Sequence, residues 1–329
     1  MNQTLPPVSL ESIRAPIHED LIQVDGVIRR RLHSEVALVR AVGEYIVEAG
    51  GKRLRPALLL LAARALGAKG PVVHELAAVI EFIHTATLLH DDVVDESDLR
   101  RGRKTANAQF GNAASVLVGD FLYSRAFQMM VEAGNLRVMN VIADATNIIS
   151  EGEVLQLLNV NDPDTDEESY LKVIRYKTAR LFEAATQVGA ILAGASPAVE
   201  AALTEFGSRL GTAFQLVDDV LDYSGDLGEM GKNLGDDLAE GKPTLPLIRA
   251  MQVGTTEERG LIRNAIEQGG RDDLDRIVAA VQRTGALDYT RDRARREAAE
   301  ATERISGLPD SAAKDSLLQL AHFSVERKF

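Results

Sequence analysis

The chain has 329 residues, of which 45% are hydrophobic and 5% aromatic, with no cysteine or tryptophan and a formal net charge of −12 at pH 7. The lack of cysteine excludes disulfides, thiolate metal sites and a cysteine nucleophile, and it fits a reducing compartment. The acidic balance argues against a nucleic-acid partner, because such proteins usually present a basic surface. The apolar content is enough for a large core, and its aliphatic character favours helices.

No segment has the pattern of a targeting signal or a membrane span. Residues 1–21 lack the charged start and apolar stretch of a signal peptide. The longest apolar run, "ALLLLAA" at 57–63, is far shorter than the roughly 20 residues that cross a bilayer. We therefore expect a cytoplasmic protein without a transmembrane segment.

Helical periodicity dominates the chain. Apolar residues recur at steps of three and four in five long segments, at 73–97, 112–134, 135–159, 168–194 and 197–226. No convincing strand, repeat or long linker interrupts them. The sequence therefore predicts one all-α domain over 1–329, a single large bundle of mostly antiparallel helices. The more charged part after residue 254 is expected to form an outer helical layer with a solvated face.

The first of these helices ends in a cluster of carboxylates. Asp91 and Asp95 are four residues apart and so share a helix face, with His84 on the same face seven residues earlier. Two like charges at about 4 Å cost roughly 4 kcal/mol at an effective dielectric near 20, so a positive charge is expected between them. Oxygen ligands without cysteine favour Mg²⁺. Asp92 points away from this face and is expected to support the metal-binding residues without contacting the metal itself. His90 is expected to be structural.

The same spacing recurs 127 residues later, at Asp218, Asp219 and Asp222. One such motif is equally compatible with an acidic patch at a helix end. Two copies, each on an apolar helix, predict an acidic cleft able to hold several Mg²⁺ ions if the helices face each other. Because Mg²⁺ usually takes its remaining ligands from water and substrate phosphates, the cleft predicts a phosphorylated ligand.

Basic residues accompany both acidic motifs. "GGKRLRP" at 50–56 precedes an apolar helix and lacks the spacing of a Walker A loop. The other basic residues of interest are Arg100, Arg101, Lys177, Lys232 and Lys242. Each alone is more often a surface residue, and His84 alone is more often a core histidine. Their position beside the acidic motifs favours phosphate binding.

Taken together, these motifs resemble the trans-isoprenyl diphosphate synthase family over essentially the whole chain. The resemblance rests on "GGKRLRP", "HTATLLHDDVVDESDLRRG", "KTA", "GTAFQLVDDVLD" and "GKNLGDDLAEGKPTLP", in the order of that family. Within it, the chain most resembles the bacterial octaprenyl diphosphate synthases that make the ubiquinone side chain. The resemblance implies the isoprenoid synthase fold, with helices around a central cavity, and a homodimer formed through central helices such as 112–133.

The resemblance also implies roles for individual residues. Asp91 and Asp95 would hold two Mg²⁺ ions and Asp218 a third, with Asp222 supporting it through water. Thr178 and Gln215 would lie beside the reacting carbons together with Lys177. The allylic diphosphate would be bound by Arg100, Lys177, Thr178, Gln215, Lys232 and Lys242. Isopentenyl diphosphate would be bound, without metal, by Lys52, Arg55, His84 and Arg101.

The implied reaction elongates an allylic diphosphate, expected to be farnesyl diphosphate, by successive 1'-4 condensations with isopentenyl diphosphate. The expected product is all-trans octaprenyl diphosphate (C40), with nonaprenyl (C45) as the alternative. Ala86 and Thr87, one turn before Asp91, are small, whereas short-chain relatives carry an aromatic residue near this point that blocks the product tunnel. Met130 and Ile142 are candidates for the tunnel floor, although either could equally be an ordinary core residue.

Three other functions fit the sequence less well. A phosphohydrolase with a His-Asp metal site would need further histidines in ligand motifs, and the sequence has none. A terpene cyclase would have no use for the isopentenyl diphosphate pocket. A non-catalytic helical subunit of a heteromeric synthase would be expected to lose acidic motifs, and both are intact.

Overall fold

A computed structural model describes residues 9–48, 50–100, 102–224, 235–270 and 272–327. The first half contains α1 (Leu10–Arg14), η1 (Ala15–Ile17), α2 (His18–Arg31), α3 (Ala37–Glu48), α4 (Leu54–Ala65), α5 (Pro71–Val94), β1 (Leu99–Arg100), β2 (Arg103–Lys104), α6 (Ala106–Phe110), α7 (Asn112–Ala133) and α8 (Leu136–Asn159). The second half contains α9 (Glu167–Ile174), η2 (Arg175–Ala179), α10 (Arg180–Leu192), α11 (Pro197–Ser224), α13 (Asp236–Ala239), α14 (Leu245–Val253), α15 (Thr256–Gln268), α16 (Leu274–Arg283), α17 (Ala286–Arg304) and α18 (Ala312–Glu326).

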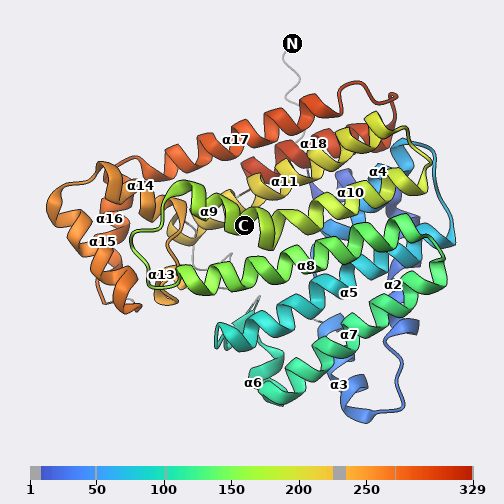
Figure 1. The fold of residues 1–329 in the computed structure, drawn as a ribbon, viewed down its shortest axis with the longest axis horizontal. Coiled ribbons are helices and arrows are strands. Elements are labelled where there is room, and N and C mark those ends of the chain that lie inside the picture. The colour runs from blue at the N-terminus through green and yellow to red at the C-terminus, as the bar shows by residue number, and fades with distance from the viewer. Residues whose placement is uncertain (1–8, 49, 101, 225–234, 271, 328–329) are drawn as a thin grey trace.

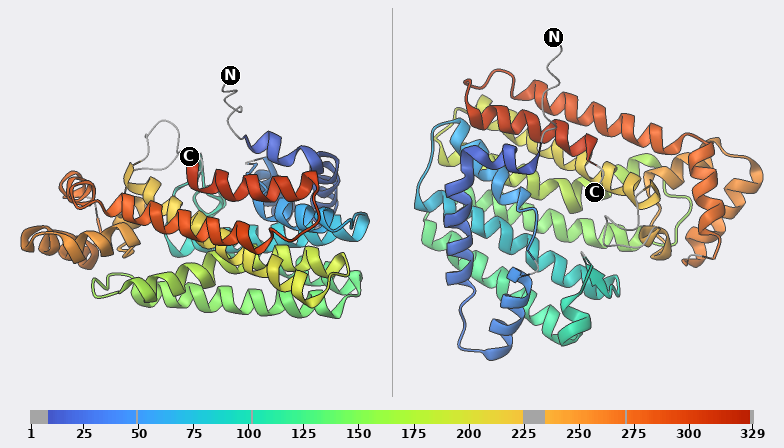
Figure 2. Two further views of the ribbon diagram at one scale, coloured as in Figure 1. Left: turned by 90° about the horizontal axis from the view of Figure 1, so that it is seen from above. Right: turned by 180° about the vertical axis from the view of Figure 1, so that it is seen from behind.

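The predicted all-α fold is confirmed. The long helices α5, α7, α8, α10, α11 and α17 run roughly along one direction, and α13 to α16 gather at one end of the bundle (Figure 1). Seen from behind, α2 crosses the direction of the long helices (Figure 2). In the part of the chain that the structure describes, the strands are β1 and β2, a two-residue antiparallel pair that the sequence did not predict.

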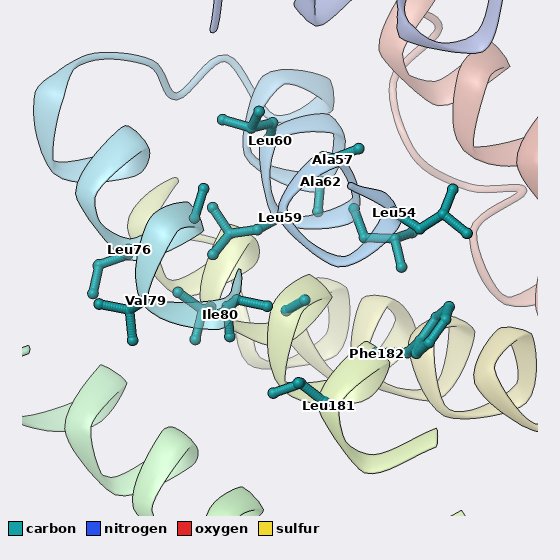
Figure 3. Close-up of a cluster of buried hydrophobic side chains, with 14 of the residues drawn as sticks. Leu54, Ala57, Leu59, Leu60, Ala62, Leu76, Val79, Ile80, Leu181 and Phe182 are labelled. Carbon is teal, nitrogen blue, oxygen red and sulfur yellow. The ribbon is translucent and has the colours of Figure 1, made fainter. Parts of the chain in front are cut away.

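Helix α5 is the centre of the main core. It starts at Pro71, whose fixed φ suits a first helical position. It packs against α7, α4, α2 and α10, and its Leu76 and Ile80 side chains are fully buried (Figure 3). By length and composition alone α5 could cross a membrane, but most of its apolar stretch is buried inside the bundle, as in a core helix. The predicted helix over 73–97 ends three residues early, with Asp95 as its C-cap.

The prediction of an outer layer after residue 254 is only partly right. On α17, Asp292, Arg295 and Arg296 are exposed, as expected of a solvated face. The opposite face carries Ala294 and Ala301, both fully buried, and α17 packs along α11. Alanines between charged residues give a weak apolar signal, although they let two helix backbones approach closely.

Close contact between α4 and α10 depends on Gly189. A Cβ atom at this position would lie 2.7 Å from the carbonyl oxygen of Leu59 and 2.8 Å from the Cβ of Ala62. Both contacts are shorter than van der Waals packing allows, so a larger residue must push the helices apart. Because α4 follows the basic loop and α10 follows the Lys177 segment, this packing also fixes the distance between those two segments.

We expect Gly189→Ala to lower the free energy of unfolding by about 1–3 kcal/mol, because it overpacks the α4–α10 contact. Urea denaturation followed by circular dichroism measures the change. Gly260→Ala is the matched control: Gly260 lies in α15 with no atom within 4 Å of a new Cβ. That control should gain up to about 1 kcal/mol from helix propensity, and equal stability of the two variants would contradict the prediction.

Candidate active site

A cavity of about 700 Å³ contains most of the residues predicted for the site. It is lined by parts of α4, α5, α8, α9, η2 and α11 and by the segment after α13. The predicted residues on its wall are Lys52, Arg55, His84, Thr87, Asp91, Asp95, Arg100, Lys177, Thr178, Gln215, Asp218, Asp222 and Lys242. Both acidic motifs therefore face one space, as the sequence predicted for helices that face each other.

Three of the predicted residues that the structure describes do not line this cavity. Ala86, Met130 and Ile142 are fully buried within the main core, so their part in product length stays a prediction. Arg101 and Lys232 lie outside the described residues.

Each predicted metal-binding carboxylate lies beside a cation. Lys177 Nζ is 3.6 Å from Asp91 Oδ2, and Lys242 Nζ donates to Asp95 Oδ2 at 3.0 Å. Arg327 Nη2 donates to Asp218 Oδ1 at 2.6 Å. The positive charge that the sequence required beside the carboxylates thus comes, in this structure, from the protein's own lysines and an arginine.

Lys177 projects from an irregular turn. Residues Arg175–Ala179 form a π-helical turn, in which Arg180 N–H bonds to the Arg175 carbonyl, between α9 and α10. Such turns are rare in proteins as a whole, but those that occur are often at functional sites. Lys177 Nζ donates to Glu153 Oε2 at 2.5 Å and to Gln156 Oε1 at 2.8 Å, both on α8. The sequence predicted one helical segment over 168–194 and assigned no role to the two α8 partners of Lys177.

Asp92 and His90 point away from the cavity-facing carboxylates. Asp92 is buried and accepts two hydrogen bonds from Arg100, from Nε at 2.9 Å and from Nη2 at 2.6 Å. His90 is turned to α7, where its Nε2 is 3.1 Å from the Val116 carbonyl oxygen and its ring stacks on Tyr123. Both positions agree with the supporting and structural roles expected from the sequence.

The second acidic motif extends into a chain of hydrogen bonds. Thr178 Oγ1 donates to Gln215 Oε1 at 3.1 Å, and Gln215 Nε2 donates to Asp219 Oδ1 at 2.8 Å. The Tyr170 hydroxyl donates to the other oxygen of Asp219. Asp219 therefore fixes the orientation of Gln215, so that the amide oxygen faces Thr178.

Another part of the cavity wall carries guanidinium groups packed on aromatic rings. The Arg55 guanidinium lies 4.7 Å from the centre of the Phe182 ring, and its Nη1 is 3.0 Å from His84 Nε2. Phe182 contacts Phe214, whose ring carries the Arg327 guanidinium at 3.9 Å. Both arginines line the cavity, and their contacts with the rings restrict the positions of the guanidinium groups.

Arg53 serves a different purpose from its neighbours in the basic loop. It has left-handed backbone geometry, with φ at 43°, immediately before α4. Its guanidinium pairs with the buried Glu81 of α5 and lies 3.6 Å from Asp25. These ion pairs hold the loop against α2 and α5, and Arg53 lines the cavity together with Lys52 and Arg55.

Burial and neighbouring negative charge raise the pKa values of several carboxyl groups in the site. Burial raises the pKa of Asp91 above its ordinary value, although Lys177 acts to lower it. Burial and then the charge of Asp91 raise the pKa of Glu153 to about 7. Burial and the charge of Asp237 raise the pKa of Asp222 to about 8. Carboxylates shifted in this direction are those whose charged form gains most from a nearby cation.

The donor set fits a hard divalent cation. Among the described residues, no three His, Asp or Glu side chains are gathered into a ready-made metal site. The oxygens of Asp91, Asp95, Asp218, Asp222 and Asp237 are instead distributed around one cavity wall. Mg²⁺ suits such an arrangement, because it keeps several waters and binds through one or two carboxylates together with phosphate oxygens.

Sequence reasoning missed several cavity residues. Glu153 and Gln156 looked like polar positions on the outer face of a helix, and Asp237 was hidden in a glycine-rich segment. Tyr170 gave no signal beyond helical periodicity, and Arg327 stands alone near the C-terminus. For Asp237, the acidic pair directly after Gly235 was an available signal.

Comparison with known proteins agrees with the fold. The family model described as polyprenyl synthetase matches residues 36–282. Octaprenyl diphosphate synthase of Escherichia coli K12 is 56% identical over 321 residues, covering 97% of this chain and 99% of that protein. All-trans-nonaprenyl-diphosphate synthase (geranyl-diphosphate specific) of Rhodobacter capsulatus is 49% identical over 318 residues, covering 96% of this chain and 98% of that protein.

A solved structure extends the likeness to three dimensions. The polyprenyl synthase of Caulobacter crescentus CB15, crystallised with calcium and isoprenyl diphosphate, superposes with a TM-score of 0.95 at 42% identity. The match covers 99% of this chain and 100% of that one. The fold and cavity thus define an all-α synthase of the isoprenyl diphosphate class. The chain belongs to the polyprenyl synthetase family.

Proposed function

We propose that this protein is a trans-polyprenyl diphosphate synthase that elongates an allylic diphosphate with isopentenyl diphosphate to octaprenyl diphosphate. The observation that carries the proposal is one cavity in which both acidic motifs face lysine and arginine side chains. The 56% identity to an octaprenyl diphosphate synthase supports the C40 product, and the 49% identity to a nonaprenyl synthase keeps C45 as the alternative. A cytoplasmic location and supply of the ubiquinone side chain belong to the same proposal.

The proposed reaction needs a cavity that stabilises a leaving diphosphate. The allylic C–O bond ionises, the C=C bond of isopentenyl diphosphate attacks the resulting carbocation, and the departed diphosphate takes the released proton. Lys177, Lys242 and Arg100 bind the oxygens of the allylic diphosphate, where negative charge develops. Mg²⁺, bound by Asp91, Asp95 and Asp218, would supply further charge neutralisation. Thr178 and Gln215 orient the reacting carbons.

We propose that the second substrate binds beside the Arg55 guanidinium and the Phe182 ring. Lys52, Arg55 and His84 bind isopentenyl diphosphate there without metal. Arg55 is suited to this role because its guanidinium is held on the Phe182 ring and presents donors in a fixed plane. Two diphosphate sites in one cavity hold the reacting carbons together, which converts a bimolecular step into an intramolecular one.

We expect Asp91→Ala to lower Mg²⁺-dependent incorporation of labelled isopentenyl diphosphate by about 100-fold or more, because the leaving group loses charge stabilisation. The fold should survive, since Lys177 keeps its contacts with Glu153 and Gln156. The purified chain alone is assayed, with Asp144→Ala, an exposed change on α8, as control. Wild-type rates for Asp91→Ala at saturating Mg²⁺ would refute the metal assignment, and an inactive wild-type chain would refute the proposed function.

We expect Ala86→Tyr to shorten the product below C40 without abolishing turnover. Ala86 is fully buried on α5, just over one turn before Asp91, so an aromatic side chain there would fill space proposed for the growing tail. Chromatography of the products measures chain length, and Ala86→Ser, which stays small, is the control. An unchanged C40 product from Ala86→Tyr would place the tail elsewhere.

We also propose that the protein forms a homodimer through α7 and α8. Eight of the 15 large apolar side chains that are exposed in the described residues lie on these helices, namely Val116, Leu117, Phe127, Val131, Leu136, Val154, Leu157 and Leu158. Concentrated apolar exposure of this kind is typical of an interaction surface. A second copy of the chain presents the same two helices, so a two-fold arrangement buries both sets at once.

We expect Leu158→Glu to convert the dimer to a monomer, because it places a carboxylate in the buried interface. Leu158 is 71% exposed in the single chain. Sedimentation velocity gives the mass, with Val253→Glu, an exposed change on α14, as the matched control. A Leu158→Glu protein with the mass of the wild-type dimer would show that the interface lies on other helices.

A further inference from the structure

The Lys177 ammonium is held by two partners on a neighbouring helix. Its nitrogen lies 2.5 Å from Glu153 Oε2 and 2.8 Å from Gln156 Oε1. An ammonium group has three N–H donors, so two of them are directed at α8. On its other side the nitrogen faces Asp91 Oδ2 at 3.6 Å, longer than a normal hydrogen bond.

Backbone packing brings α8 to this position. A Cβ atom on Gly152 would lie 2.6 Å from the backbone nitrogen of Lys177 and 2.9 Å from the carbonyl carbon of Tyr176. Helix α8 therefore touches the π-helical turn backbone to backbone. Glu153 follows Gly152 directly, and Gln156 lies three residues further, on the adjacent part of the same face. The glycine places both acceptors within reach of the lysine that projects from that turn.

We propose that Glu153 and Gln156 are positioning residues, which hold two donors of Lys177 and direct the third toward a diphosphate bound at Asp91. This inference rests on the proposed function and deepens it. A lysine side chain is long and flexible, so an unrestrained ammonium could pair with Asp91 directly and no longer face the substrate. The two α8 contacts fix the ammonium before the diphosphate arrives, so less side-chain entropy is lost on binding.

The first test separates the two substrates kinetically. Glu153→Ala should raise the KM for the allylic diphosphate by about tenfold and change the KM for isopentenyl diphosphate by less than about twofold. Glu153→Gln keeps an acceptor oxygen, so its KM for the allylic diphosphate should lie between those of the wild type and Glu153→Ala. Glu303→Ala is the matched control, because Glu303 is exposed on α17, outside the cavity and the proposed dimer interface. Equal increases in both KM values for Glu153→Ala would overturn the proposal.

The second test asks whether Glu153 acts through Lys177. Adding Glu153→Ala to Lys177→Met should cause no further loss, because the group being positioned is already gone. Calorimetric binding of inorganic diphosphate with Mg²⁺ provides the same comparison without catalysis. If Glu153→Ala lowered affinity for the allylic substrate as strongly in the Lys177→Met background as in the wild type, the proposal would be overturned.

Two controls keep the result interpretable. Gln156→Ala should show the same selective effect on the allylic substrate, and it replaces Glu153→Ala if that variant fails to fold by circular dichroism. The proposal would also be overturned if neither Gln156→Ala nor Glu153→Gln raised the KM for the allylic diphosphate selectively. Failure of the proposed function has a different signature, namely wild-type protein that incorporates no isopentenyl diphosphate.

Discussion

Carboxylates from two helix ends can face one cavity only if cations lie beside them. At about 4 Å, each unpaired like-charge contact would cost roughly 4 kcal/mol at an effective dielectric near 20. Lys177 and Lys242 neutralise the first motif, and Arg327 neutralises Asp218. These cations come from the π-helical turn, the segment after α13 and the C-terminal end. The Lys242–Asp95 and Arg327–Asp218 pairs therefore also link two distant segments to α5 and α11.

The apolar half of α5 gives this charged end a rigid base. Leu76 and Ile80 are fully buried, so the helix axis is fixed by packing with α4 and α10. Asp91 and Asp95 follow on the last turn and at the C-cap. A binding group carried by a packed helix keeps its geometry better than one carried by a loop. The core and the candidate site are in this sense two ends of one helix.

Much of this arrangement could be predicted from sequence, because spacing encodes it. The two acidic motifs, the basic loop and the helix lengths follow from three- and four-residue steps. Arg327 could not be predicted, since a single arginine has no periodicity and its contact with Asp218 spans 109 residues. Glu153 and Gln156 were missed because polar residues on a helix are usually solvated. Four residues were predicted to set product length. Ala86, Met130 and Ile142 are buried and Thr87 lines the cavity, and the role of all four remains a prediction.

The π-helical turn also sets the phase of one continuous helical segment. Upstream, Tyr170 and Ile174 pack in a core cluster with α11 and α14, whereas downstream Phe182 and Ala185 pack in the main core with α4. Each residue added to or removed from a helix rotates everything after it by about 100°. The extra residue that the turn accommodates thus lets a single helix face two different cores. A one-residue deletion within Arg175–Ala179 would put one of these faces out of register.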